Sequence, residues 1–154
     1  MTPHERYYDW HNYQLYDIID ASPIATERAI KLSPKKSIQI IQTVCDIFGL
    51  DYPKIDISNE DEVETTNDRI VINKDEQESS LLHQISHYVT IKLFNNYEHT
   101  PEMNRIQTII MSRYYGIPTT VLVKSMKVYG LKVAPHNIIP KFVCSKSIWK
   151  KNLK

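Results

Sequence analysis

Two histidines, His83 and His87, lie four residues apart in the segment SSLLHQISHYVTIKLF. On a helix, residues at this spacing lie on one face, a turn apart. Neutral imidazole nitrogens are common zinc ligands, so the pair could form part of a zinc site. The residue after the first histidine is Gln84, where the zinc-peptidase motif His-Glu-x-x-His carries a glutamate as its general base.

A third histidine, His99, lies twelve residues after His87 and just before a predicted helix start at Thr100 and Pro101. Catalytic zinc sites use three protein ligands and leave one position for water, so a chain that reverses here could complete the site. Two alternatives remain open. In one, the pair consists of two separately hydrogen-bonded histidines; in the other, the third ligand is a carboxylate, Glu98 or Glu102. For Glu102, we favour a role in supporting a metal ligand, or an interaction with the helix N-terminus, over a role as a ligand itself.

The elements that would position these residues follow from periodicity and from start and stop signals. Strand-like alternation occurs around Ile55 and Ile57, and a hairpin is predicted where residues 63–66 and 69–73 flank Asn-Asp. We therefore predict an α+β fold, with a small antiparallel sheet packed on helices. Helices are predicted at residues 33–48, 76–94, 101–114 and 119–129.

The predicted helix at residues 76–94 carries the histidine pair. At about 100° per residue, one stripe of this helix is apolar, and the two histidines lie roughly 120° away on a face that is also partly apolar. We therefore expect the helix to be buried on both faces, where imidazoles need partners. The stripe consists of Leu82, Ile85, Val89 and Leu93.

Composition sets the broader limits. The 154 residues suit about one domain, which we predict at residues 1–135, followed by a basic tail at residues 136–154. The net charge of +1 argues for neither nucleic acid nor membrane, so the tail is the only feature that points to nucleic acid. Two cysteines indicate free thiols rather than a disulfide scaffold. Without a secretion signal or an apolar span, we predict a cytoplasmic protein with no membrane partner.

Several segments together resemble a known family. The fragments LLHQISH and EHTPEM resemble the zincin-like metallopeptidases of tailed phages, which are similar to SprT-like zinc proteases. The likeness covers residues 6–135. It implies a zincin-like fold with His83, His87 and His99 as zinc ligands, a protein or peptide substrate, and location in the host cytoplasm. Four further fragments resemble that family: RYYDWH, YPKIDIS, SRYYGI and YGLKVAP.

Three positions depart from the family pattern. Thr100 replaces a glycine and Met103 an aromatic residue, and both replacements are compatible with a capped, apolar helix start. Gln84 matters more, because glutamine can hydrogen-bond water but cannot accept its proton. General-base catalysis is worth about 10²–10⁴-fold, so the resemblance implies a zinc site with almost no peptidase activity.

Two origins of the glutamine at position 84 are compatible with the sequence. It could be natural, which makes the chain a zinc-stabilised pseudo-peptidase that acts as a protein-binding module. It could also be an engineered replacement of glutamate, which the intact remainder of the motif favours. A glutamate codon at position 84 of the parent gene would decide for the enzyme. Either way, the oligomeric state stays open.

The remaining reactive side chains have simpler interpretations. His4, His11 and His136 lack ligand spacing and are expected in surface or core roles. Cys45 and Cys144 are expected to be inert thiols, and the N-terminal aromatic run a packing element. Tyr97, Tyr114 and Tyr115 could offer a phenol to an oxyanion, but aromatic packing is the usual explanation.

Overall fold

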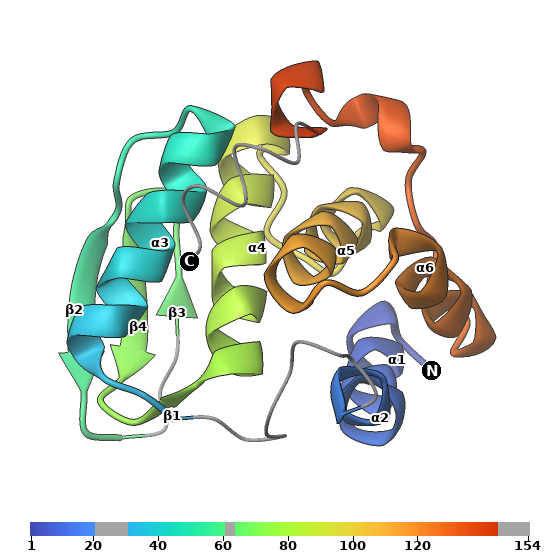
Figure 1. Ribbon diagram of the computed structural model, residues 1–154, viewed down its shortest axis with the longest axis horizontal. Coiled ribbons are helices and arrows are strands. Elements are labelled where there is room, and N and C mark those ends of the chain that lie inside the picture. Colours follow the sequence, from blue (N-terminus) through green and yellow to red (C-terminus); the bar gives the residue numbers. More distant parts are fainter. Residues whose placement is uncertain (21–30, 61–63, 145–154) are drawn as a thin grey trace. The chain divides into compact units, whose positions relative to one another are not determined.

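The computed structural model describes residues 1–20, 31–60 and 64–144. It has the predicted α+β composition (Figure 1). The chain groups into two compact units. One unit combines Ala29–Tyr97 with Pro140–Lys154 and contains the strands. The other combines Met1–Arg28 with Glu98–Ile139 and is helical.

The strand-containing unit places two helices beside a small sheet. Helices α3 and α4 contact each other, and α4 also contacts strands β3, β4 and β5. Ile70 and Ile72, alternate residues of β4, are fully buried, as expected for the inner face of a strand. Its elements are β1 (Lys31–Leu32), α3 (Pro34–Phe48), β2 (Lys54–Ser58), β3 (Glu64–Thr65), β4 (Arg69–Asn73), β5 (Glu76–Gln77), α4 (Glu78–Phe94) and the 3-10 turn η3 (Lys141–Cys144).

The pairing of β2 corrects the predicted antiparallel sheet. The hairpin is confirmed, since β3 pairs antiparallel with β4 and Thr65 lies opposite Ile70. The other edge of β4 accepts β2 in the parallel direction, with Ile55 opposite Ile70. The sheet is therefore mixed, because β4 lies between an antiparallel neighbour, β3, and a parallel neighbour, β2. The separate antiparallel pair β1–β5 was not predicted, because two-residue strands are too short to show periodicity.

Helix α3 begins and ends at its predicted signals. The Ser33 hydroxyl accepts a hydrogen bond from the Lys36 amide at 3.2 Å, and Pro34 occupies the first turn. Gly49 ends the helix with φ of 67°, a left-handed conformation that costs glycine little.

Helix α4 confirms the expected burial on both faces. Leu82, Ile85 and Val89 are fully buried, and His83 on the second face is only 5% exposed. The helix ends at Asn95, which adopts a left-handed conformation with φ of 53°. The predicted start at residue 76 was two residues early, because Glu76 and Gln77 form β5.

Hydrogen bonds join separate segments of the helical unit. The Trp10 indole donates a hydrogen bond to the Ser125 hydroxyl at 2.8 Å, which joins α1 to α6. The Ala134 amide donates to the Pro101 carbonyl at 3.0 Å, so the segment after α6 returns along α5. Its elements are α1 (Pro3–Trp10), the π-helical turn η1 (His11–Leu15), α2 (Tyr16–Asp20), α5 (Pro101–Tyr115), α6 (Thr119–Val128) and the 3-10 turn η2 (His136–Ile138).

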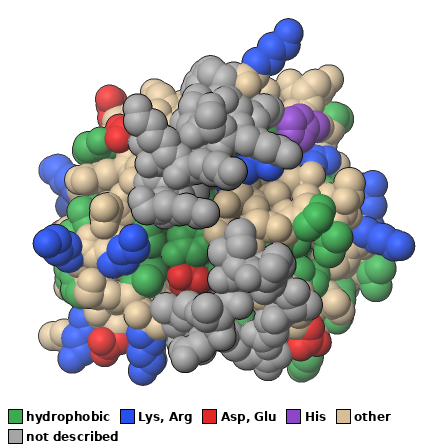
Figure 2. Space-filling view, in the orientation of Figure 1, with side chains coloured by type: hydrophobic (Ala, Val, Ile, Leu, Met, Phe, Trp, Pro, Cys, Tyr) green, Lys and Arg blue, Asp and Glu red, His purple; other side chains and the backbone are tan. Residues whose placement is uncertain are grey.

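The predicted basic tail is described only in part. Lys141 is exposed, whereas Lys146, Lys150, Lys151 and Lys154 lie outside the described residues. On the described part of the face in Figure 2, Lys and Arg side chains are scattered among other side chains and form no continuous patch. Among the helices of the described ranges, none is both long and apolar enough to cross a bilayer.

Candidate metal centre

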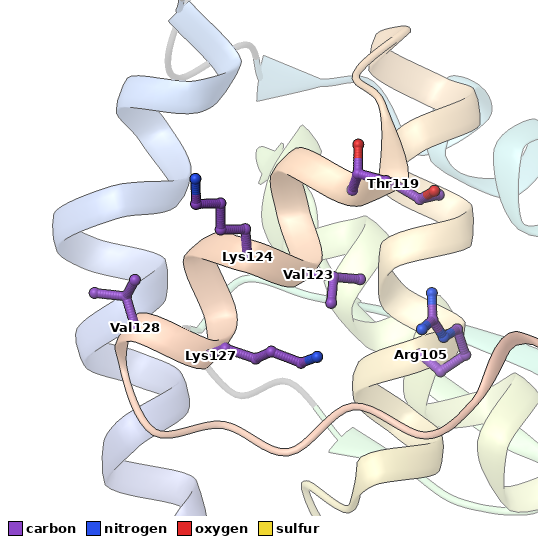
Figure 3. A pocket seen from close by; sticks show the side chains of 7 residues that line it. Arg105, Thr119, Val123, Lys124, Lys127 and Val128 are labelled. Carbon is purple, nitrogen blue, oxygen red and sulfur yellow. The ribbon is translucent and has the colours of Figure 1, made fainter.

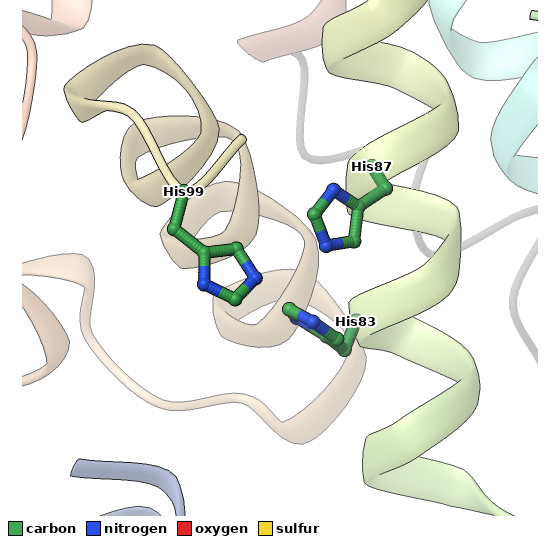
Figure 4. Close-up of side chains that lie close together, drawn as sticks. All are labelled: His83, His87 and His99. Atoms are coloured by element: carbon green, nitrogen blue, oxygen red, sulfur yellow. The ribbon is translucent and has the colours of Figure 1, made fainter. Parts of the chain in front are cut away.

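Three imidazoles converge in the structure. His83 and His87 project from one side of α4, and His99 lies in the segment between α4 and α5; all three rings point toward one another (Figure 4). One ring nitrogen from each histidine can be chosen so that all three lie within 4.8 Å of one another. The ring centroids of His83 and His87 are 4.6 Å apart. These are the three residues that the sequence predicted to act together.

The donor set and its spacing suit a small divalent metal. Zinc–imidazole bonds of about 2.0–2.1 Å in tetrahedral geometry hold ligand nitrogens roughly 3.3 Å apart. The observed limit of 4.8 Å is therefore within reach after small side-chain rotations. His83 and His99 are 5% and 8% exposed, whereas His87 is only partly buried. Imidazole also suits copper, iron and nickel, so this geometry supports a metal site without selecting the metal.

The helix explains the first two ligands. Because α4 is regular from Glu78 to Phe94, His83 and His87 differ by one turn and share a face. His99 depends on the chain reversal after Asn95, where the left-handed residue ends the helix. Thr100 then caps α5 by accepting a hydrogen bond from the Met103 amide at 3.3 Å. The third histidine is therefore held between the end of one helix and the start of the next.

Gln84 is buried beside the pair and has a defined partner. Its side chain is 8% exposed, and the Thr65 hydroxyl donates a hydrogen bond to its Oε1 at 2.5 Å. Thr65 belongs to the short strand β3, so this strand supplies the hydrogen-bond partner of the Gln84 side chain. The sequence analysis did not identify Thr65, because a lone threonine in a two-residue strand carries no motif.

The two carboxylates considered as alternative third ligands, Glu98 and Glu102, do not join the histidine group. Among the described residues, the group of potential ligands that the structure gathers consists of the three histidines, without Glu98 or Glu102. Glu102 lies in the first turn of α5, where a negative charge interacts favourably with the helix dipole. Its predicted role in supporting a metal ligand stays a prediction.

The other predicted roles are mostly packing roles. Burial raises the pKa of the Cys45 thiol to about 12, which agrees with an inert thiol; the side chain of Cys144 lies outside the described residues. His11 is 8% exposed, and burial lowers its pKa. The rings of Tyr114 and Tyr115 pack edge to face at 5.1 Å. Tyr97 and His136 are exposed.

A separate hollow of about 580 Å³ lies in the helical unit, along α6 (Figure 3). None of the three histidines lines it. One of its cations is fixed, because Arg105 Nε donates a hydrogen bond to the Ala134 carbonyl at 2.7 Å, and burial lowers the pKa of this guanidinium. The lining residues are Arg105, Thr119, Thr120, Val123, Lys124, Lys127 and Val128.

Comparison of the chain with protein-family models, with curated proteins and with solved structures finds no match.

Proposed function

We propose that the chain is a zinc-binding domain of the metallopeptidase type, with glutamine in the position of the general base. The observation that carries the proposal is the convergence of three imidazoles within 4.8 Å, two of them one turn apart on α4. Gln84 next to the first ligand is the second support, because it is buried and oriented by Thr65. The proposed substrate is a peptide bond in a protein.

Each residue has a distinct part in this proposal. His83, His87 and His99 would bind zinc through neutral ring nitrogens, which leaves a coordination position for water. When bound, zinc would lower the pKa of that water to about 7 and polarise the scissile carbonyl. A glutamate at position 84 would accept a proton on its carboxylate and pass it to the leaving amine. The Gln84 amide cannot accept that proton, so the chain as it stands should bind substrate without cleaving it.

The Thr65 hydrogen bond favours a second candidate function. With its Oε1 engaged by a hydroxyl donor, Gln84 is a neutral amide with a defined hydrogen-bond partner. Such an arrangement suits a pseudo-peptidase in which zinc stabilises the fold and the domain binds another protein. The two candidates share the metal centre and differ only in whether a carboxylate at position 84 produces hydrolysis.

The experiment that separates them compares the chain with its Gln84→Glu variant. Both are incubated with a host or partner proteome, and new protein termini are read by mass spectrometry with and without a chelator. The peptidase proposal expects new termini only with the glutamate variant, and a gain of at least the general-base factor of about 10²–10⁴. The double variant Gln84→Glu/His99→Ala is the matched control and should produce none.

If the glutamate variant cleaves nothing while both forms capture the same protein, the peptidase proposal is wrong and the binding module is favoured. Termini that persist in chelator or in the double variant would point to a contaminating protease.

A further inference from the structure

The third histidine is surrounded by rings from the N-terminal helix. His4 of α1 stacks on His99 with ring centroids 5.0 Å apart and an angle of 8° between the planes. Tyr7, one turn further along α1, lies 4.6 Å from His99 at 43°. All three residues belong to the same compact unit. Tyr8 of the same helix lies further away, with its ring centroid 6.0 Å from that of His99, so α1 supplies all of these ring contacts.

Tyr7 is itself held in place. It is fully buried, and Gln107 of α5 donates a hydrogen bond from Nε2 to the Tyr7 hydroxyl. The Trp10 ring packs against it at 5.7 Å. A side chain with these contacts offers a fixed surface to its neighbour, whereas His4 is exposed and contributes through its ring alone.

His99 needs such contacts more than the other two histidines do. His83 and His87 are positioned by the regular backbone of α4, but His99 lies in the irregular segment between Phe94 and Pro101. A ligand on irregular backbone loses more conformational freedom when it binds a metal, so contacts that already restrict its ring increase the affinity. Partners that orient a metal ligand by hydrogen bonding typically change metal affinity by about 10–100-fold, and we use this range as the scale for ring contacts that restrict the same ligand.

We propose that α1 is a working part of the metal centre, in which His4 and Tyr7 are positioning residues that hold the His99 ring in its metal-binding orientation. The inference rests on the metal binding within the proposed function, and it does not depend on peptide hydrolysis. His4 acts through its flat ring and not as a ligand. Imidazole lone pairs lie in the ring plane, so two stacked rings in nearly parallel planes do not aim at one ion.

The test uses exposed His4, since its replacement leaves the buried core intact. Zinc affinity is measured for the full chain and its variants by competition with a chromophoric chelator at one neutral pH. Cobalt(II) absorption then reports the ligand set. His4→Ala should weaken zinc binding by about 10–100-fold, with the metal-free melting temperature unchanged. His4→Phe, which keeps a flat ring without nitrogens, should restore most of the affinity and preserve the cobalt spectrum. Tyr13→Ala, at a side chain 69% exposed on η1, is the control and should change neither.

Two results would overturn the inference while the metal centre stands. One is a His4→Ala variant with unchanged affinity. The other is a His4→Phe variant as weak as His4→Ala with an altered cobalt spectrum, because His4 would then be a ligand. Failure of the unsubstituted chain to bind zinc would overturn the proposed function and this inference together. A zinc-binding chain whose Gln84→Glu variant cleaves nothing would contradict the peptidase alone.

Discussion

At the residue scale, the proposed chemistry depends on a few side chains whose neighbours the structure defines. His83 and His87 have their spacing from α4, and His99 has its burial and ring contacts from the segments around it. Gln84 has Thr65 as its partner. Each of these contacts can be tested separately by its effect on zinc affinity or on hydrolysis.

Removing the third ligand is the most direct test of the metal centre. We expect His99→Ala to weaken zinc binding by more than the 10–100-fold that is typical for a supporting residue, because a ligand is lost outright. His136→Ala is the matched control, since His136 is exposed on η2 and should have no effect. Competition titration measures both variants. Equal affinities for the two would remove His99 from the ligand set.

The Thr65 hydrogen bond should matter once a carboxylate occupies position 84. In the Gln84→Glu background, Thr65→Val should lower kcat by about 2- to 13-fold, which corresponds to one hydrogen bond of roughly 0.5–1.5 kcal/mol. Zinc affinity should not change. Thr66→Val, whose hydroxyl instead donates to Asp68 at 2.9 Å, serves as the neighbouring control. A loss of zinc affinity in Thr65→Val would show that Thr65 supports the metal site rather than the base.

At the element scale, the helix ends determine where the site residues lie. Helices α3 and α5 have the same construction, with a hydroxyl cap followed by proline. Only the α5 cap, Thr100, directly follows a proposed ligand. The segment just before α4 contains a buried carboxylate, Glu76 of β5.

The two caps form a matched pair of substitutions. Ser33→Ala and Thr100→Ala should each reduce the free energy of unfolding by about 1 kcal/mol, because each leaves a helix amide without its side-chain acceptor. Only Thr100→Ala should also weaken zinc binding, since His99 precedes it. Chemical denaturation in chelator and zinc titration measure the two effects. If both variants bind zinc equally well, the start of α5 does not position the ligand.

Glu76 gives the turn before α4 a predictable pH dependence. It is 3% exposed and accepts a hydrogen bond from the Asn73 amide at 2.8 Å, and burial raises its pKa. A raised pKa in the folded state favours folding at low pH, and this contribution is lost as the pH rises above the ordinary glutamate value of about 4.5.

The variant Glu76→Gln keeps an acceptor without the charge. Its stability relative to the unsubstituted chain should therefore increase between pH 4 and pH 7, as measured by denaturation in chelator. Asp75→Asn, at an exposed neighbouring carboxylate, is the control substitution. A stability difference for Glu76→Gln that is constant with pH would mean that Glu76 titrates normally.

At the scale of the whole molecule, metal binding should be linked to folding. The two histidines of α4 are close in any helical state, but His99 joins them only in the folded chain. Zinc at 100 times its Kd should therefore raise the free energy of unfolding by about 2.7 kcal/mol.

Melting curves with zinc and with chelator measure this linkage, and His83→Ala/His87→Ala should melt at one temperature in both. Zinc stabilisation should weaken below about pH 6.5, because the ligating imidazoles must be neutral. Equal melting temperatures for the unsubstituted chain with and without zinc would contradict a metal centre.

The sequence by itself determined the local features of this protein. The hydroxyl and proline starts of α3 and α5, their glycine ends and the helical register of His83 and His87 were all predictable, because these signals act within a few residues of backbone. The β3–β4 hairpin was predictable for the same reason.

Tertiary structure decided everything that depends on distant partners. The parallel pairing of β2 with β4, the hydrogen bond from Thr65 to Gln84 and the stacking of His4 on His99 join residues that are far apart along the chain. No local pattern specifies such partners, since side-chain packing over the whole fold selects them. The spacing of the histidines predicted which residues could bind a metal, but only the folded chain brought His99 to the pair.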